Sequence, residues 1–246
     1  MRLYDQRTGE YSDVRPGLRV HVADGAVRAL VTADLLRRVA ERVTRRPVRV
    51  SRSAGVSVPA APFNVPDFDV ADPPADAVQI SGSPGHHLHV PEPPGTFSTP
   101  SAPGAVGAVG AVGDSGVAGD LGHSDASETS AGSDASGDPV AFRLAVLRLR
   151  HRDPATGLDT GRAVDDLSRW RAAMAEWAGS PGRPIDRAYM AEAEAALADD
   201  LDSPAALAVL DRLAADPEVP PGAKLETVIH LDMLLALDLV AHIGRA

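Results

Sequence analysis

The sequence predicts an α/β fold for the N-terminal part of the chain and an all-α fold for the C-terminal part, joined by a disordered linker. Three observations lead to this prediction. Before residue 90, short runs alternate apolar with polar residues, as half-buried strands do. After residue 138, apolar residues recur every three or four positions, as in amphipathic helices. Between these parts, residues 91–137 consist largely of Gly, Ala, Ser, Val and Asp. We therefore expect domains at residues 1–90 and 138–246.

A strand, a helix and a second strand follow one another in the N-terminal part. Residues 18–22 alternate as a strand does, and residues 29–46 carry an apolar stripe along one helix face. Pro47 is expected to stop this helix, and residues 48–50 form a second short strand. The order predicts a βαβ unit with parallel strands and a right-handed crossover.

Two parallel strands are too few for a stable sheet, so further strands are expected. Residues 77–81 alternate in the same way, and residues 2–5 and 10–14 suit a small edge hairpin. Together these segments predict a reduced Rossmann-like domain with four or five strands at most.

The linker has a composition that does not favour folding. Residues 105–113 repeat Ala-Val-Gly three times, and residues 124–137 are mainly Ser, Ala, Asp and Gly. Such a segment buries too little apolar surface to offset its chain entropy. Its glycines do not suit a phosphate-binding loop, because no Lys-Ser or Lys-Thr follows them. Limited proteolysis is expected to cut here and to release a helical fragment that begins near Asp138.

The C-terminal part predicts a bundle of antiparallel helices with short connections. A stripe of Val164, Leu167, Trp170, Met174 and Trp177 is expected to be core rather than a cofactor site. Ser203 is expected to be an N-cap, with Pro204 in the first turn and the carboxylates of Asp199, Asp200 and Asp202 beside it. The predicted helices cover residues 138–149, 160–178, 186–199, 203–214 and 225–243.

Charge limits the classes of partner. The chain carries 24 Lys and Arg against 34 Asp and Glu, a net charge of −10. Phosphate binding depends on basic clusters, so we expect tRNA binding no tighter than about 10⁻⁴ to 10⁻⁶ M. Two groups of arginines are exceptions to the acidic trend, and we interpret the first as a solvated helix face. The first group is Arg37, Arg38, Arg42, Arg45, Arg46, Arg49 and Arg52, and the second is Arg143, Arg148, Arg150 and Arg152.

Composition also limits the chemistry and the location. The chain has no cysteine, which excludes disulfides, thiolate metal sites and cysteine nucleophiles. No apolar run is long enough to span a membrane, and no signal-peptide pattern opens the sequence. We expect a soluble cytoplasmic protein with no membrane partner.

Three histidines lie close together at His86, His87 and His89. Neutral imidazoles bind metals, so the cluster raises the question of a metal site. No Asp, Glu or Cys stands at a customary ligand spacing beside them, and the flanking sequence is rich in proline. An exposed loop is the favoured interpretation, and we assign no metal ligand.

Residues 199–207, Asp-Asp-Leu-Asp-Ser-Pro-Ala-Ala-Leu, resemble a turn in the helical domain that follows the catalytic core of cysteinyl-tRNA synthetases. Residues 138–144 are similar to a helix start in the same domain. More faintly, residues 2–5 and 15–22 are similar to the opening of these enzymes. A related cysteine ligase of mycothiol synthesis shares this pattern. The resemblance covers residues 1–52 and 138–246 and lacks the middle of the synthetase.

The resemblance implies a class I aminoacyl-tRNA synthetase ancestry, but the groups that carry catalysis in that family are absent. The family places a Cys-Gly-Pro-Thr zinc ligand and a His-Ile-Gly-His turn after the first strand, where this chain has Ala23-Asp24-Gly25-Ala26. The family's Lys-Met-Ser-Lys loop has no counterpart, because the one lysine, Lys224, falls in the predicted last helix.

Cations stabilise the charge that develops in adenylation, so the loss of these groups removes the expected mechanism. We assign no catalytic, cofactor-binding or metal residue and expect neither ATP nor zinc as a cofactor. The sequence thus favours a non-catalytic, cysteinyl-tRNA-synthetase-like paralogue that binds a protein partner. The alternative is a reduced class I ligase, similar to cysteine-tRNA ligase, that retains ATP or tRNA binding.

Overall fold

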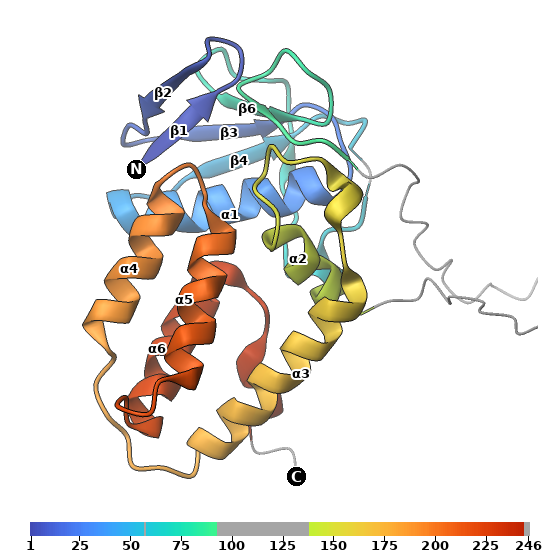
Figure 1. Ribbon diagram of the computed structural model, residues 1–246. Coiled ribbons are helices and arrows are strands. Elements are labelled where there is room, and N and C mark those ends of the chain that lie inside the picture. Colours follow the sequence, from blue (N-terminus) through green and yellow to red (C-terminus); the bar gives the residue numbers. More distant parts are fainter. Residues whose placement is uncertain (57, 93–137, 244–246) are drawn as a thin grey trace, which may run out of the picture.

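The computed structural model describes residues 1–56, 58–92 and 138–243, and it has three layers (Figure 1). A sheet forms the first layer, the helix α1 (Val27–Thr44) lies beneath it, and the C-terminal helices pack against the other side of α1. The α/β prediction for the N-terminal part is confirmed. The predicted disordered linker falls almost entirely on residues 93–137, which lie outside the described residues.

The main sheet is parallel and has five strands in the order β5-β4-β3-β6-β7. Val20 of β3 pairs with Val50 of β4 on one side and with Val78 of β6 on the other. The helix α1 connects β3 to β4, which confirms the predicted βαβ unit. The sequence did not predict β5 and β7, because two residues are too few to show alternation. The strands are β3 (Arg19–Val22), β4 (Arg49–Arg52), β5 (Asp69–Val70), β6 (Val78–Ser81) and β7 (Leu88–His89).

The N-terminal hairpin consists of β1 (Arg2–Asp5) and β2 (Glu10–Asp13), which pair antiparallel. It forms a separate two-stranded sheet, so the prediction of a hairpin is confirmed and its place as an edge of the main sheet is wrong. The strand β7 already occupies that edge. The hairpin loop approaches it through Gln6, whose amide N–H donates to the carbonyl of His87 at 2.9 Å.

The N-terminal half of α1 is buried on all sides because the helix lies between the sheet and the bundle (Figure 1). Every residue from Val27 to Leu36 is buried, including the charged Arg28 and Asp34. The helix ends at Thr44, earlier than predicted, and Arg45 has the left-handed φ of 53°. Pro47 disfavours helical geometry at Arg46, so the chain turns before the proline.

The prediction of five C-terminal helices is confirmed, but the last helix has different bounds. It begins at Pro221 and ends at Leu235, where Ala236 turns left-handed with φ 54°. Asp232 stabilises this end, since its carboxylate accepts the backbone N–H groups of Leu237 and Leu239 at 2.7 and 2.9 Å. A short 3₁₀ turn, η3 (Leu239–His242), follows. The helices are α2 (Pro139–Leu147), α3 (Thr160–Trp177), α4 (Arg187–Ala198), α5 (Ser203–Ala215) and α6 (Pro221–Leu235).

Two local predictions in the bundle need correction. The N-cap of α5 is Asp202 rather than Ser203, because its carboxylate accepts the Ala205 N–H at 3.2 Å. On α3, Val164 is 44% exposed and Ala163 is buried in its place. The other four members of the predicted stripe are buried, and with Ala163 they form one regular stripe at spacings of three and four residues.

One connected hydrophobic core runs through all three layers. It includes Val20 and Ile80 of the sheet, Leu36 of α1, and Trp170 and Leu231 of the bundle. The division into domains at residues 90 and 138 therefore stays a prediction. No helix among the described residues combines the length and the apolar character that a membrane span requires.

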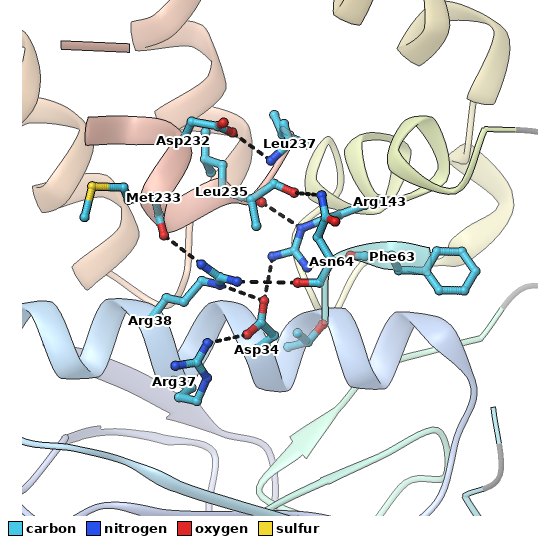
Figure 2. Close-up of polar contacts among 12 residues, drawn as sticks. Asp34, Arg37, Arg38, Phe63, Asn64, Arg143, Asp232, Met233, Leu235 and Leu237 are labelled. Atoms are coloured by element: carbon cyan, nitrogen blue, oxygen red, sulfur yellow. Dashed lines mark hydrogen bonds and ion pairs between the residues drawn. The ribbon is translucent and has the colours of Figure 1, made fainter. Parts of the chain in front are cut away.

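A buried cluster of charges joins α1 to the bundle (Figure 2). The Asp34 carboxylate lies 2.9 Å from the Arg143 guanidinium of α2, and both side chains are fully buried. Arg37 and Arg38 each lie 2.8 Å from the same carboxylate. Arg143 also donates to the carbonyls of Phe63 and Leu235, at 3.0 and 2.7 Å. The cluster thus joins α1, α2, α6 and residues 61–64 at one point.

Candidate functional site

The topology of the sheet indicates where a ligand site would lie. In an open parallel sheet, ligands bind beyond the carboxyl ends of the strands, at the point where the strand order reverses direction. Here that point lies between β3 and β6, because the chain leaves β3 through α1 towards β4 while β6 pairs on the other side. The loops that meet there are residues 23–26 and 82–83.

Asp24 ties these two loops together. Its Oδ1 atom accepts hydrogen bonds from the Ser81 hydroxyl at 2.7 Å, the Gly82 N–H at 2.6 Å and the Ser83 N–H at 3.3 Å. Burial alone would raise the pKa of Asp24, but these hydrogen bonds outweigh it and hold the pKa below its ordinary value. Asp24 is therefore a charged acceptor that closes the loops on each other.

Two glycines allow the loops to approach closely. Gly25 has φ +115°, and a Cβ atom there would lie 2.9 Å from the Cβ of Ala29. A Cβ atom at Gly82 would lie 3.4 Å from the Cα of Gly25 and 3.2 Å from the Cγ of Glu92. Side chains at these positions would separate the loops or displace Glu92.

Glu92 occupies the N-terminus of α1. The N-cap residue, Ala26, has no side chain that can accept a hydrogen bond. Instead, Oε1 of Glu92 accepts the N–H groups of Ala26 and Ala29 at 2.9 and 3.1 Å. Free N–H groups and the helix dipole make a helix N-terminus a binding place for anions. In this chain the anion at that place is its own carboxylate.

Arg28 holds the segment that carries Glu92. Its fully buried guanidinium donates to the carbonyl of Pro91 and, at 2.9 Å, to the carbonyl of Arg150. Burial raises the pKa of Glu92, while the amides of Ala26 and Ala29 and the charge of Arg28 act in the opposite direction. We name the Glu92 carboxylate at the start of α1 the plug. It is held by the amides of Ala26 and Ala29 and by the charge of Arg28.

No residue of the plug was assigned to a site from the sequence. Glu92 lies 66 positions from Ala26. A Glu within a proline-rich stretch has no local pattern that would predict its contact with a distant helix. The strands were the only usable signal, since residues after parallel strands gather at one edge of a sheet. The two-residue β7, which positions Glu92, was itself too short to predict.

The histidines 86, 87 and 89 each have a hydrogen-bond partner, and the first two share Gln79. Nδ1 of His86 lies 2.8 Å from the side-chain oxygen of Gln79, and Nδ1 of His87 accepts the Gln79 N–H at 3.2 Å. Nε2 of His89 lies 3.0 Å from the Gly82 carbonyl. The described ranges hold no group of three side chains of metal-ligand type. The expected exposed loop is wrong in part, because Leu88 and His89 form β7 and Leu88 is buried.

A fourth histidine was missed by the sequence reasoning. His21 of β3 is fully buried and lies between two hydroxyl groups, with Nδ1 2.9 Å from Ser51 and Nε2 3.0 Å from Ser53. Burial lowers the pKa of His21, with Asp72 opposing the shift. The arrangement is a satisfied polar contact between neighbouring strands, and its imidazole is covered from solvent.

The acidic turn between α4 and α5 binds the N-terminal hairpin. The Arg2 guanidinium contacts both carboxylate oxygens of Asp199, at 2.5 and 3.0 Å. The Tyr4 N–H donates to Asp200 at 2.8 Å, and the Asp200 N–H donates to the Arg2 carbonyl at 2.9 Å. The residues that carry the family resemblance therefore have a structural role here, which is to dock β1 on the bundle.

The second arginine group is neutralised by carboxylates. Arg150 lies 2.5 Å from Asp202, and Arg152 lies 3.6 Å from Asp200. The other two members are also paired with carboxylates. Arg148 pairs with Asp166, and Arg143, which lies in the buried cluster away from the acidic turn, pairs with Asp34. The structure thus pairs each of these four arginines, and they do not form an open basic patch.

Lys224, the single lysine, lies in the first turns of α6 and is 8% exposed. Its ammonium group donates to the Ala214 carbonyl at 2.8 Å and lies 5.6 Å from the centre of the Trp177 ring. These contacts hold the buried ammonium group in place, and its charge contributes to lowering the pKa of Asp216. They place it within the bundle and on a different layer from the sheet.

His151 is buried beside the acidic turn, and we expect it to make stability depend on pH. Among the described residues neither ring nitrogen has a hydrogen-bond partner, and Nε2 lies 3.9 Å from Asp200. Burial lowers the pKa of His151 below its ordinary 6.5, although Asp200 opposes the shift. The unfolded chain then binds a proton that the folded chain does not. The free energy of unfolding should therefore fall as the pH falls through about 6.5, by at most ~1.4 kcal/mol per pH unit for this group.

The measurement is urea denaturation at several pH values between about 5.5 and 7.5, in the wild type and in His151→Leu. The substitution removes the proton-binding group, so the variant should lose part of the pH slope. Equal slopes in the two proteins would contradict a role for His151.

A scan of protein-family models finds none that matches the chain. Part of it is similar to curated enzymes named L-cysteine:1D-myo-inositol 2-amino-2-deoxy-alpha-D-glucopyranoside ligase. The protein of Streptomyces griseus is 42% identical over 111 residues, which cover 42% of this chain and 25% of the relative. That of Streptomyces scabiei is 46% identical over 87 residues, covering 35% and 20%. That of Thermomonospora curvata is 39% identical over 109 residues, covering 42% and 25%.

The matched part spans a quarter or less of the length of each of these relatives. The similarity to a cysteine ligase, inferred from the sequence, is confirmed at this level. The chain is thus similar to these ligases over part of its length, and the matches leave three quarters or more of each relative uncovered.

Proposed function

We propose that this chain is a non-catalytic relative of cysteine ligases and acts by binding a protein partner. The observation that carries the proposal is the plug. A nucleotide phosphate bound at the switch point would need the N–H groups of Ala26 and Ala29, and the Glu92 carboxylate already accepts both. A phosphate would also meet the repulsion of that carboxylate and of Asp24.

The distribution of cations supports the same proposal. Adenylation of an amino-acid carboxylate by ATP needs positive charge near the ATP phosphates. The one lysine is buried in the bundle, and the guanidinium nearest to the plug, Arg28, is engaged with the carbonyls of Pro91 and Arg150. Three arginines that stand near the acidic turn are paired with carboxylates.

Nucleotide binding tests the proposal directly. We expect isothermal titration calorimetry to detect no saturable ATP binding at millimolar nucleotide, and we expect no cysteine-dependent exchange of pyrophosphate into ATP. Elemental analysis should find no stoichiometric zinc. Saturable ATP binding by the wild type, or exchange with any amino acid, would contradict the proposal.

Two variants of Glu92 separate the plug from the rest of the site. Glu92→Gln keeps a side-chain oxygen at the α1 N-terminus, whereas Glu92→Ala vacates it. If the carboxylate is what excludes phosphate, inorganic pyrophosphate should bind Glu92→Ala more tightly than the wild type, with Glu92→Gln in between. Equal weak binding in all three proteins would contradict the role of the plug and leave the missing cations as the cause.

The second candidate function is a reduced ligase that keeps ATP or tRNA binding. The specific observation in its favour is the identity of about 40% to ligases. The exchange assay above decides between the two. For tRNA we propose weak binding only, because the arginines near the acidic turn are paired and the chain has a net charge of −10.

A further inference from the structure

We propose that the groove between α1 and α6 binds an acidic peptide segment of a partner protein, with an apolar side chain of that segment packed on Met233. We name this site the α1–α6 groove. It is a cavity of about 220 Å³ lined by Arg37, Arg38, Glu41 and Arg42 of α1 and by His230 and Met233 of α6. The proposal rests on the proposed function, since it says where a partner would bind.

The groove carries more positive than negative charge. Three arginines and one glutamate line it, and Arg37 and Arg38 share the buried carboxylate of Asp34. The buried Arg143 lies outside the lining, because it pairs with Asp34 beneath the groove and also interacts with the charge of Asp232. Glu41 compensates part of this excess by pairing with Arg37 at 3.1 Å. The remaining charge faces the groove because the side chains of Arg37 and Arg38 stay 22% and 24% exposed while Asp34 is fully buried.

The positive charge continues past the end of α1. A second hollow shares Glu41 and Arg42 with the groove and is also lined by Arg45. Arg42 is paired with Glu194 of α4 at 2.6 Å, with both side chains partly exposed. Neither Arg45 nor Arg46 has an ion-pair partner in the part of the chain that the structure describes. A bound acidic segment would supply the missing carboxylates along this line.

Met233 gives the groove its apolar contact. The side chain is 61% exposed, the highest value among the large apolar side chains of the described residues. Its backbone is fixed, because Arg38 donates to the Met233 carbonyl at 2.9 Å (Figure 2). A methionine side chain adapts to the shape of a partner, and such residues are common at binding surfaces. The groove therefore offers an apolar contact beside fixed guanidinium groups.

These features suit a peptide better than a nucleic acid. Single strands are held by aromatic side chains on which bases stack, and none of the residues that line the groove is Phe, Tyr or Trp. Glu41 and Glu194 lie among the arginines and would repel a long polyanion, as would the net charge of −10. A short segment can place its carboxylates between them.

The test uses fluorescence polarisation with a labelled peptide of Glu, Leu and Ala. A second peptide has Lys in place of Glu, and a third probe is a single-stranded RNA. We expect the acidic peptide to bind best and its affinity to fall with added salt. Met233→Glu and Arg42→Glu should each weaken binding about tenfold or more, a loss of ~1.4 kcal/mol.

Matched controls exist on other helices. Val164→Glu changes an apolar side chain of α3 that is 44% exposed, and Arg212→Glu changes an arginine paired with Glu192 at 2.6 Å, the distance between Arg42 and Glu194. Neither control should alter the affinity. Circular dichroism shows whether each variant is folded.

Three results would overturn the proposal: no binding of the acidic peptide, equal weakening by the controls, or tighter binding of RNA. ATP titration of the same samples keeps this test apart from the proposed function. If the wild type binds neither ATP nor the peptide, only the α1–α6 groove is wrong. If it binds ATP, the proposed function fails whatever the peptide does.

Discussion

Asp34→Ala is expected to lower the free energy of unfolding by about 3–5 kcal/mol, the cost of breaking a buried ion pair by removing one partner. Three guanidinium groups surround this carboxylate, and that of Arg143 is fully buried with it. Without Asp34 the Arg143 guanidinium stays in the core without a paired carboxylate, and it keeps the carbonyls of Phe63 and Leu235 and the weaker attraction of Asp232. Urea denaturation of the wild type and the variant measures the loss.

An exposed ion pair provides the control. Asp199 contacts Arg2 through both carboxylate oxygens, but the two side chains are 51% and 55% exposed. Solvent screens such pairs, so Asp199→Ala should cost about 0–1 kcal/mol. The double variant Asp34→Leu/Arg143→Met removes both buried charges and should recover part of the loss. An effect of Asp34→Ala no larger than that of Asp199→Ala would contradict the role of the buried cluster.

The same carboxylate contributes to stability in a pH-dependent way. Burial alone would raise the pKa of Asp34, but the charges of Arg143 and Arg38 outweigh it and the pKa falls below its ordinary value of 3.8. The folded chain therefore binds fewer protons than the unfolded chain near that pH. The contribution is complete above the ordinary value and is lost as the pH falls through the lowered pKa.

The elements that the sequence predicted are those with a local signal. Alternation over residues 18–22 and a helical stripe over residues 160–178 depend only on neighbouring positions, and both elements formed close to their predicted bounds. The last helix was predicted too far along the chain. Residues 236–243 are apolar enough to continue it, but the Asp232 carboxylate binds the amides of Leu237 and Leu239 and ends it.

The candidate site depends on contacts between distant residues, which no local pattern carries. Glu92 is 66 positions from Ala26. The same holds for the buried charge cluster, in which Asp34 and Arg143 are 109 positions apart. From the sequence we interpreted the first arginine group, which includes the arginines of α1, as a solvated helix face. That reading is wrong for Arg37 and Arg38, because α1 lies between two layers and both side chains are mostly covered.

Trp170→Ala is expected to lower the free energy of unfolding by about 3–5 kcal/mol, as large-to-small changes of buried aromatic residues do. Trp170 is 2% exposed and belongs to the core shared by the three layers. Its Nε1–H donates to the Asp211 carboxylate at 3.0 Å, which connects α3 to α5. The substitution leaves a cavity and removes this link, so the denaturation midpoint in urea should shift strongly.

Trp170→Phe divides the effect into its two sources. Phenylalanine keeps most of the ring volume and loses the N–H, and Asp211 stays paired with Arg169 at 3.0 Å. The variant should therefore lose about 0.5–1.5 kcal/mol for the hydrogen bond, plus a smaller packing term. Val164→Ala on the same helix, where the side chain is 44% exposed, should stay within about 0.5 kcal/mol of the wild type. If Trp170→Ala matched Val164→Ala, the tryptophan would not be part of the core, and the packing of α3 in the bundle would have another origin.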